Sequence, residues 1–186
     1  AKELYDLMRE KYVTKREAGS LTATLDNPIV VTGASYSEAK SVAENEITER
    51  FYTAYAAFMM DSPSAFWIRS NGIVYYLSYT MNGDAYQCAI RKVTIQTVEE
   101  YYDGASSQIT AFDQAVAQAK AEIRAKAGEK ADAYELVTAI HDYLCDKLVY
   151  DTPAGNALGN DAYNYAHTAS TVFLGHDGEY KVVCEG

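Results

Sequence analysis

The dipeptide Asn82-Gly83 constrains the fold of this chain more than any other feature, because it separates two segments in which apolar and polar residues alternate. Asn-Gly is a preferred pair for a two-residue hairpin turn that needs positive φ. The alternating segments cover residues 73–80 and 85–97 and have the period of half-buried strands. The sequence therefore predicts an antiparallel β-hairpin.

The strand register follows from the position of this turn. If Asn82 and Gly83 are the two turn residues, cross-strand partners alternate between the two faces of the hairpin. The predicted pairs on the apolar face are Met81–Asp84, Tyr79–Tyr86, Leu77–Cys88 and Tyr75–Ile90. The opposite face is mixed, so we expect one face of the hairpin against a core and the other in water.

Apolar residues at helical spacing predict helices on both sides of the hairpin. The expected helices run from Glu3 to Ala18, from Ser37 to the residue before Asp61, from Gly104 to Gly128, from Ala131 to the residue before Asp151, and from Thr168 to Leu174. Residues 66–69 are expected to form a strand, residues 21–35 a connector with one short strand, and residues 154–165 a long surface loop. We predict an α+β fold with an N-terminal region of helices and a small antiparallel sheet at residues 1–106, followed by a largely helical region at 107–186.

Charge and cysteine content exclude several classes of function. The chain has 16 Lys and Arg against 26 Asp and Glu, a formal charge of -10, which argues against a nucleic-acid partner. It has no apolar run of about eighteen residues, so we expect no membrane span. Cys88, Cys145 and Cys184 are too far apart for a disulfide framework or a paired metal motif. We predict no cofactor and no metal, and interpret the acidic segment Asp151 to Asp161 as a solvated loop and not a calcium site.

Three stretches of the sequence together resemble the transglutaminase-like superfamily, in the form found in extracellular proteins of Gram-positive bacteria. They are Asp61-Ser62-Pro63-Ser64-Ala65-Phe66-Trp67-Ile68, then residues 140–151 with the sequence IHDYLCDKLVYD, and finally Val182-Val183-Cys184-Glu185-Gly186. The resemblance covers residues 36–186. It implies that residues 107–186 are the helical first half of a papain-like core.

The resemblance also implies that Cys184 is a catalytic nucleophile at the start of a helix. A helix N-terminus and a nearby imidazolium lower a thiol pKa, and the thiolate then attacks a carboxamide or peptide carbonyl. The implied substrate is a protein or peptide, attacked at a glutamine side chain or a peptide bond, with cell-wall peptide as one source. The family places its histidine and its acid after the cysteine, and nothing follows Gly186, so we expect this chain to be an inactive part of an extracellular or cell-surface enzyme.

Alternative interpretations apply to the other reactive residues. Cys88 is expected to pack in the hairpin, and Cys145 and His141 are expected to have structural or incidental roles. His167 or His176 would serve as the base only in a rewired peptidase. Trp67 and the hairpin tyrosines are expected in the core and not on a carbohydrate-binding platform. The alternative function for the whole chain is a non-catalytic cell-surface binding or scaffold module on the same fold. The sequence leaves the oligomeric state open.

Overall fold

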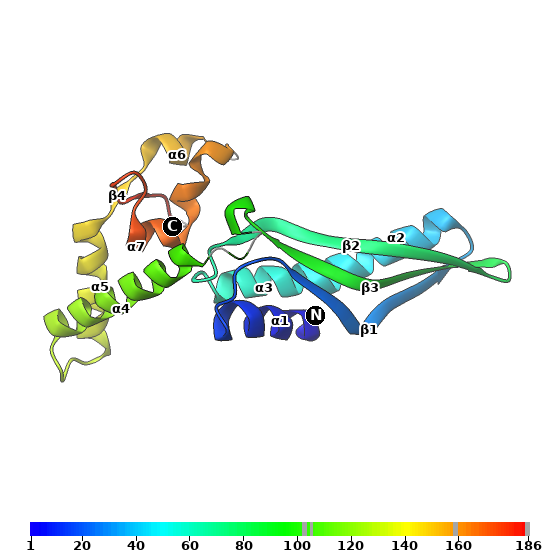
Figure 1. Cartoon of the computed structure of the whole chain (residues 1–186), viewed down its shortest axis with the longest axis horizontal. Coiled ribbons are helices and arrows are strands. Elements are labelled where there is room, and N and C mark those ends of the chain that lie inside the picture. The colour runs from blue at the N-terminus through cyan, green and yellow to red at the C-terminus, as the bar shows by residue number, and fades with distance from the viewer. Residues whose placement is uncertain (102–103, 105, 158–159, 185–186) are drawn as a thin grey trace. The chain divides into compact units, whose positions relative to one another are not determined.

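The computed structural model describes residues 1–101, 104, 106–157 and 160–184. These residues form two compact units, Ala1–Ser106 and Ser107–Gly186, which we describe separately (Figure 1). Helices and a small antiparallel sheet make up the fold, which confirms the predicted α+β class. No helix within the described residues is long and apolar enough to cross a membrane.

The first unit combines a three-stranded antiparallel sheet with helices along it (Figure 1). Its elements are α1 (Lys2–Met8), the π-helix η1 (Arg9–Thr14), β1 (Leu21–Gly33), α2 (Tyr36–Ile47), the π-helix η2 (Thr48–Tyr52), α3 (Thr53–Asp61), β2 (Ile68–Asn82), β3 (Ala85–Thr97) and the short 3-10 helix η3 (Glu99–Tyr101). The strand order is β1-β3-β2, so β3 is central and β1 and β2 are the edges.

An aromatic and aliphatic core lies between the helices and one face of this sheet. The predicted helical stripe is buried as expected: Ile47, Phe51, Ala54, Tyr55 and Phe58 are all at most 5% exposed. Trp67 is fully buried and meets the Tyr12 ring edge-on at 6.2 Å. Trp67 is therefore a core residue, as predicted, and not part of a carbohydrate platform.

The predicted hairpin forms, but its register is shifted by two residues. Asn82 pairs with Ala85, and Tyr79 pairs with Cys88, so the turn residues are Gly83 and Asp84. Among the four residues 82–85, Gly83 alone has positive φ, at 64°. A positive φ at the first central residue is typical of glycine in a type II′ turn. A shift of two preserves the faces of the strands, so Cys88 remains on the buried side.

The expected connector at residues 21–35 is wrong, because β1 is a strand of 13 residues along the edge of the sheet. The segment Asp26-Asn27-Pro28 suggested a turn, whereas it forms an irregularity between Thr24 and Ile29 where the register with β3 shifts. Proline is tolerated at such edge positions because its missing N–H is not needed by a neighbour. The strand predicted at residues 66–69 is the beginning of β2, which is continuous through Asn82.

The helix boundaries differ from the predictions mainly at their ends. The first helix ends at Thr14 and not at Ala18, and Arg16 beyond it has a positive φ of 54°. The second predicted helix continues through α2, η2 and α3 to Asp61, and Ser35 caps its start by accepting a hydrogen bond from the Glu38 N–H.

The second unit is mainly helical. It consists of α4 (Ser107–Ala127), α5 (Ala133–Lys147), β4 (Val149–Tyr150), α6 (Thr152–Asn156), the 3-10 helix η4 (Asp161–His167), α7 (Ala169–Leu174) and β5 (Lys181–Val182). Helix α5 ends at Lys147, earlier than predicted, because Leu148 leaves the helix to begin a parallel pairing of β4 with β5. The surface loop expected at residues 154–165 is wrong, because α6 and η4 occupy much of it and Ala154 and Ala166 are fully buried.

Candidate functional site around Cys184 and Asp151

The segment that ends at Cys184 is held by hydrogen bonds on both sides. On one side, Val149 N–H donates to Tyr180 O at 3.0 Å and Asp151 N–H donates to Val182 O at 2.8 Å. On the other side, Val183 N–H donates to Ala166 O at 3.0 Å. Val183 is buried, whereas Cys184 is exposed and its thiol is free. The structure thus presents an accessible thiol at the end of a fixed backbone segment.

The helix start expected at Cys184 is not tested, because Glu185 and Gly186 of the motif lie outside the described residues. What the structure does describe is the approach to the cysteine, which is the short strand β5 followed by Val183.

Asp151 is a buried carboxylate, only 4% exposed, at the junction of β4 and α6. Its Oδ1 accepts from Ala154 N–H at 3.0 Å, which caps α6, and its Oδ2 accepts from the Tyr165 hydroxyl at 2.8 Å. These two donors lower the pKa of Asp151, the backbone N–H of Ala154 most strongly. The same contact with Asp151 raises the pKa of Tyr165. The expected solvated acidic loop is therefore wrong at Asp151, while the Asp161 side chain lies outside the described residues.

His176 extends this cluster through ring stacking. Its imidazole lies parallel to the Tyr165 ring, with centroids 4.0 Å apart and an interplanar angle of 7°. Its Nε2 is also 3.7 Å from an Asp177 carboxylate oxygen. Asp151, Tyr165 and His176 therefore form a continuous polar and aromatic array from the end of β4 to the turn before β5.

This array borders a pocket of about 480 Å³. The residues lining it are Tyr150, Asp151, Thr152, Pro153, Tyr163, Tyr165, His176, Asp177, Glu179 and Lys181. Tyr163 and Tyr165 also pack against the buried cluster of Ala154, Ala166 and Val183. The pocket and the segment that presents Cys184 therefore share the same aromatic supports.

Lys181 contributes a positive charge to the pocket and is paired there. Its Nζ lies 2.6 Å from a Glu179 carboxylate oxygen, and this contact raises the pKa of Lys181. Because Glu179 pairs with Lys181, the carboxylates of Asp151 and Asp177 are the remaining acidic groups that line this pocket.

The other two cysteines differ sharply from each other. Cys88 is fully buried, and burial raises its pKa, which confirms its expected packing role. Cys145 is exposed on α5, and its Sγ lies 3.5 Å from His141 Nε2. Their spacing of four residues on a helix places Cys145 and His141 on one face, and this proximity could have been predicted from the sequence.

Comparisons with protein-family models, with curated protein sequences and with solved structures gave no match. Function is therefore inferred from the residues and contacts described above.

Proposed function

We propose that the chain is part of a transglutaminase-like cysteine enzyme in which Cys184 is the nucleophile. The observation that supports this most directly is an exposed, free thiol at the end of a segment whose backbone is hydrogen-bonded on both sides. A nucleophile works best when its position is fixed before the substrate arrives, because the entropy of alignment is then already lost. The resemblance of the surrounding sequence supplies the reaction class.

In the proposed reaction, the Cys184 thiolate attacks the carbonyl carbon of a glutamine side chain or a peptide bond. The tetrahedral intermediate collapses to a thioester acyl-enzyme, and ammonia or an amine leaves with a proton. Water or a second amine then attacks the thioester and regenerates the thiol. In the family pattern, a histidine and an acid that follow the cysteine accept and return the proton.

The pocket beside β5 is the proposed binding place for part of the protein or peptide substrate. Tyr150, Tyr163 and Tyr165 offer aromatic surface, and polar side chains lie around them. The family resemblance further suggests an extracellular or cell-surface location on a Gram-positive bacterium and a cell-wall peptide as one candidate substrate.

A non-catalytic binding module is the second candidate function. It is favoured by the arrangement of His176, whose ring stacks on Tyr165 and whose Nε2 lies near Asp177. A histidine held in this way supports the shape of the pocket and does not have to act as a base. On this alternative, the pocket binds a surface peptide and no covalent step occurs.

Alkylation of the full-length parent protein tests the enzyme proposal. A short pulse of iodoacetamide, followed by peptide mass spectrometry, compares Cys184 with Cys145, which is also exposed and outside any disulfide. The comparison is made in a His141→Gln background, because His141 Nε2 lies 3.5 Å from Cys145 Sγ and an imidazole can activate a thiol. A proposed nucleophile is expected to react faster than a cysteine without a catalytic role, so Cys184 is expected to be alkylated several-fold faster. Equal rates at the two cysteines would contradict the assignment.

Activity separates the two candidate functions. The parent protein is expected to release ammonia or cleave peptide from a glutamine-containing substrate, Cys184→Ser is expected to abolish this, and Cys145→Ser is expected to preserve it. Binding of the peptide without any turnover would favour the module.

A further inference from the structure

A second pocket, of about 530 Å³, lies in the second unit and is lined by residues of α4, α5 and α7 and by Tyr180, which precedes β5. The residues that line it are different from those that line the pocket beside β5. Small-ligand sites commonly have volumes of about 300–1,000 Å³. The side chains of Ile123, Tyr143 and Phe173, together with Tyr180, give this pocket an apolar and aromatic surface. A ligand that enters it would therefore bury an apolar group.

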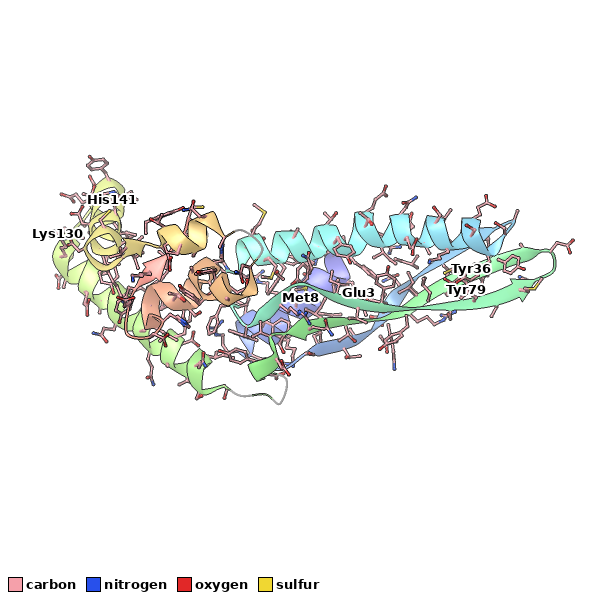
Figure 2. The ribbon with its side chains drawn as sticks, turned by 90° about the horizontal axis from the view of Figure 1, so that it is seen from above. Glu3, Met8, Tyr36, Tyr79, Lys130 and His141 are labelled. Carbon is pink, nitrogen blue, oxygen red and sulfur yellow. The ribbon has the colours of Figure 1, made fainter. Side chains whose placement is uncertain are left out.

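Lys147 places a positive charge among the three rings. It is the last residue of α5, the helix on which Figure 2 labels His141, and it is half-buried. Its Nζ lies 4.4 Å from the ring centroid of Tyr180, 5.5 Å from that of Tyr143 and 5.8 Å from that of Phe173. A cation within about 6 Å of a ring centroid is attracted to the face of the ring. The rings therefore hold the ammonium group at a defined place in the pocket.

The rings themselves are held by the fold. The buried Phe112 ring meets the Phe173 ring edge-on, with centroids 5.5 Å apart. Tyr180 O accepts a hydrogen bond from β4 at 3.0 Å, and Tyr143 lies one turn before Lys147 on the same face of α5. Because these walls are fixed before a ligand arrives, little conformational entropy is lost on binding.

The Lys147 ammonium group has no carboxylate partner among the residues that the structure describes. Its hydrogen bond within this part of the chain goes to the Tyr143 hydroxyl, at 3.3 Å. A lysine ammonium group has three N–H donors, so two of them are left for water or for a ligand. Since burial beside the rings removes part of the hydration of this charge, an anionic ligand would restore its polar contacts.

The two carboxylates that line the pocket oppose an anionic ligand only weakly. Asp146 Oδ2 lies 3.6 Å from Lys126 Nζ, and the Asp146 side chain is 80% exposed. Glu122 is also exposed and accepts a hydrogen bond from Gln118 Nε2 at 2.8 Å. Water screens exposed charges of this kind. A cationic ligand, by contrast, would meet an ammonium group that already occupies the faces of the rings.

We propose that this pocket binds a carboxylate attached to an apolar group, with Lys147 as the ionic partner of the carboxylate. The carboxylate accepts the two remaining N–H donors of Lys147, and the apolar group lies against Ile123, Phe173 and Tyr180. The C-terminus of a peptide that ends in a large apolar residue and a small free carboxylic acid both have this chemistry. The proposal does not depend on the function of Cys184.

Titration of the ¹⁵N-labelled 186-residue chain, followed by nuclear magnetic resonance, tests the proposal. The probes are N-acetylphenylalanine, its C-terminal amide and acetate. N-acetylphenylalanine is expected to shift the backbone amide signals of Lys147, Phe173 and Tyr180. It is expected to bind at least about tenfold more tightly than the amide, which lacks the charge, and than acetate, which lacks the apolar group.

A tripeptide that ends in phenylalanine distinguishes the two sources of the ligand. Tighter binding of the tripeptide than of N-acetylphenylalanine would identify the site as one for a peptide C-terminus. Equal or weaker binding would identify it as one for a small free acid. Both results support the site, provided that the C-terminal amide of each probe binds more weakly.

Three variants separate the ion pair from general effects of charge. Lys147→Met keeps the apolar stem and removes the charge, so it is expected to weaken binding of N-acetylphenylalanine at least about tenfold and to remove the preference for acid over amide. Lys147→Arg is expected to retain that preference, because a guanidinium group stacks on rings and pairs with carboxylates. Lys120→Met is the matched control, because it removes a positive charge from an exposed position of α4 that does not line the pocket. It is expected to change the affinity by less than about twofold.

Several results would overturn the proposal. They are equal binding of acid and amide, no shifts around the pocket at millimolar probe, and full affinity in a Lys147→Met chain whose circular dichroism is unchanged. Tighter binding of tetramethylammonium than of N-acetylphenylalanine would also overturn it, because the rings would then be a site for a cation that Lys147 fills in the free chain.

Discussion

The irregularity in β1 is expected to depend on one side chain, Glu3 of α1. Glu3 Oε1 accepts from Asp26 N–H at 2.6 Å, and Oε2 accepts from Asn27 N–H at 3.3 Å. These two N–H groups lie where the pairing of β1 with β3 shifts, between Thr24 and Ile29. We therefore predict that Glu3→Ala destabilises the first unit and releases the irregular segment of β1.

The size of the effect follows from the type and exposure of these bonds. Hydrogen bonds to charged groups contribute about 1.5–3 kcal/mol each, and neutral ones about 0.5–1.5. Asp26 and Asn27 are exposed, so water replaces the carboxylate in the variant and only the lower part of this range applies. Glu3 also lies in the first turn of α1, where a negative charge adds about 0.3–1 kcal/mol. The expected loss in unfolding free energy is about 1–2 kcal/mol.

Two assays separate the clamp from the helix effect. Urea unfolding followed by fluorescence reports the first unit, because Trp67 is the only tryptophan and is fully buried there. Amide hydrogen exchange reports the clamp itself, and the Asp26 and Asn27 amides are expected to exchange at least about fivefold faster in Glu3→Ala. Glu10→Ala is the control, since Glu10 has a 3.5 Å surface pair with Lys15. It is expected to change stability by less than about 0.5 kcal/mol.

Unchanged exchange at Asp26 and Asn27 would refute the reasoning, even if stability fell. Such a result would mean that the carboxylate acts only on the start of the helix. Equal stability losses in Glu3→Ala and Glu10→Ala would also count against the clamp, because the described ion pair of Glu10 is with Lys15 and not with β1.

Two further predictions concern Asp151 and the hairpin turn. Contacts with Ala154 and Tyr165 lower the pKa of Asp151, so its contribution to stability is present above the ordinary carboxyl pKa of about 3.9 and is lost as pH falls through the lower folded value. Asp151→Asn is therefore expected to lower the free energy of unfolding at pH 7, and to lower it progressively less below about pH 4. Urea unfolding followed by circular dichroism measures this difference. Asp177→Asn is the control, because the Asp177 side chain is 92% exposed. Gly83→Ala is expected to lower the free energy of unfolding by about 1–2 kcal/mol, as measured by Trp67 fluorescence. The loss comes from the positive φ alone, because an added Cβ meets nothing within 4 Å. Asp84→Ala is expected to lower it clearly less, and equal losses in the two variants would contradict the type II′ turn.

Local pattern predicted those parts of the fold that depend on neighbouring residues. The stripe from Ile47 to Phe58 follows from periodicity and is confirmed. The predicted apolar face of the hairpin is confirmed at Cys88 and Ile90, which are buried, whereas Met81 near the turn is 66% exposed. The edge strand β1 could not be predicted in this way, because its irregularity is satisfied by Glu3, more than twenty residues earlier. The predicted hairpin register was wrong because the sequence permits two placements of the turn; a type I′ turn at Asn82-Gly83 needs positive φ at both residues, and Asn82 lacks it and pairs with Ala85 instead.

In the candidate site, too, local features could be predicted from the sequence and contacts between distant residues could not. The order Asp151-Thr152-Pro153 was interpreted only as the end of α5, although an aspartate two residues before a proline is also typical of a helix N-cap, and Asp151 caps α6. The bond from Tyr165 to Asp151 and the stacking of His176 depend on how η4 and the turn before β5 meet, which no spacing indicates. The Cys145–His141 pair, by contrast, could have been found from its spacing alone.

The two exposed cysteines of the second unit suit different chemistry because their supports differ. Cys184 follows a segment in which successive backbone groups are bonded to β4 and to Ala166, so its position is fixed by the chain itself. Cys145 lies on the open face of a helix, where its side chain is restrained by little more than His141. An acyl-transfer nucleophile needs the first kind of support, since misplacement by about 1 Å can lower the rate a hundredfold. Cys145 lacks this kind of backbone support, so Cys145→Ser is expected to preserve the proposed activity.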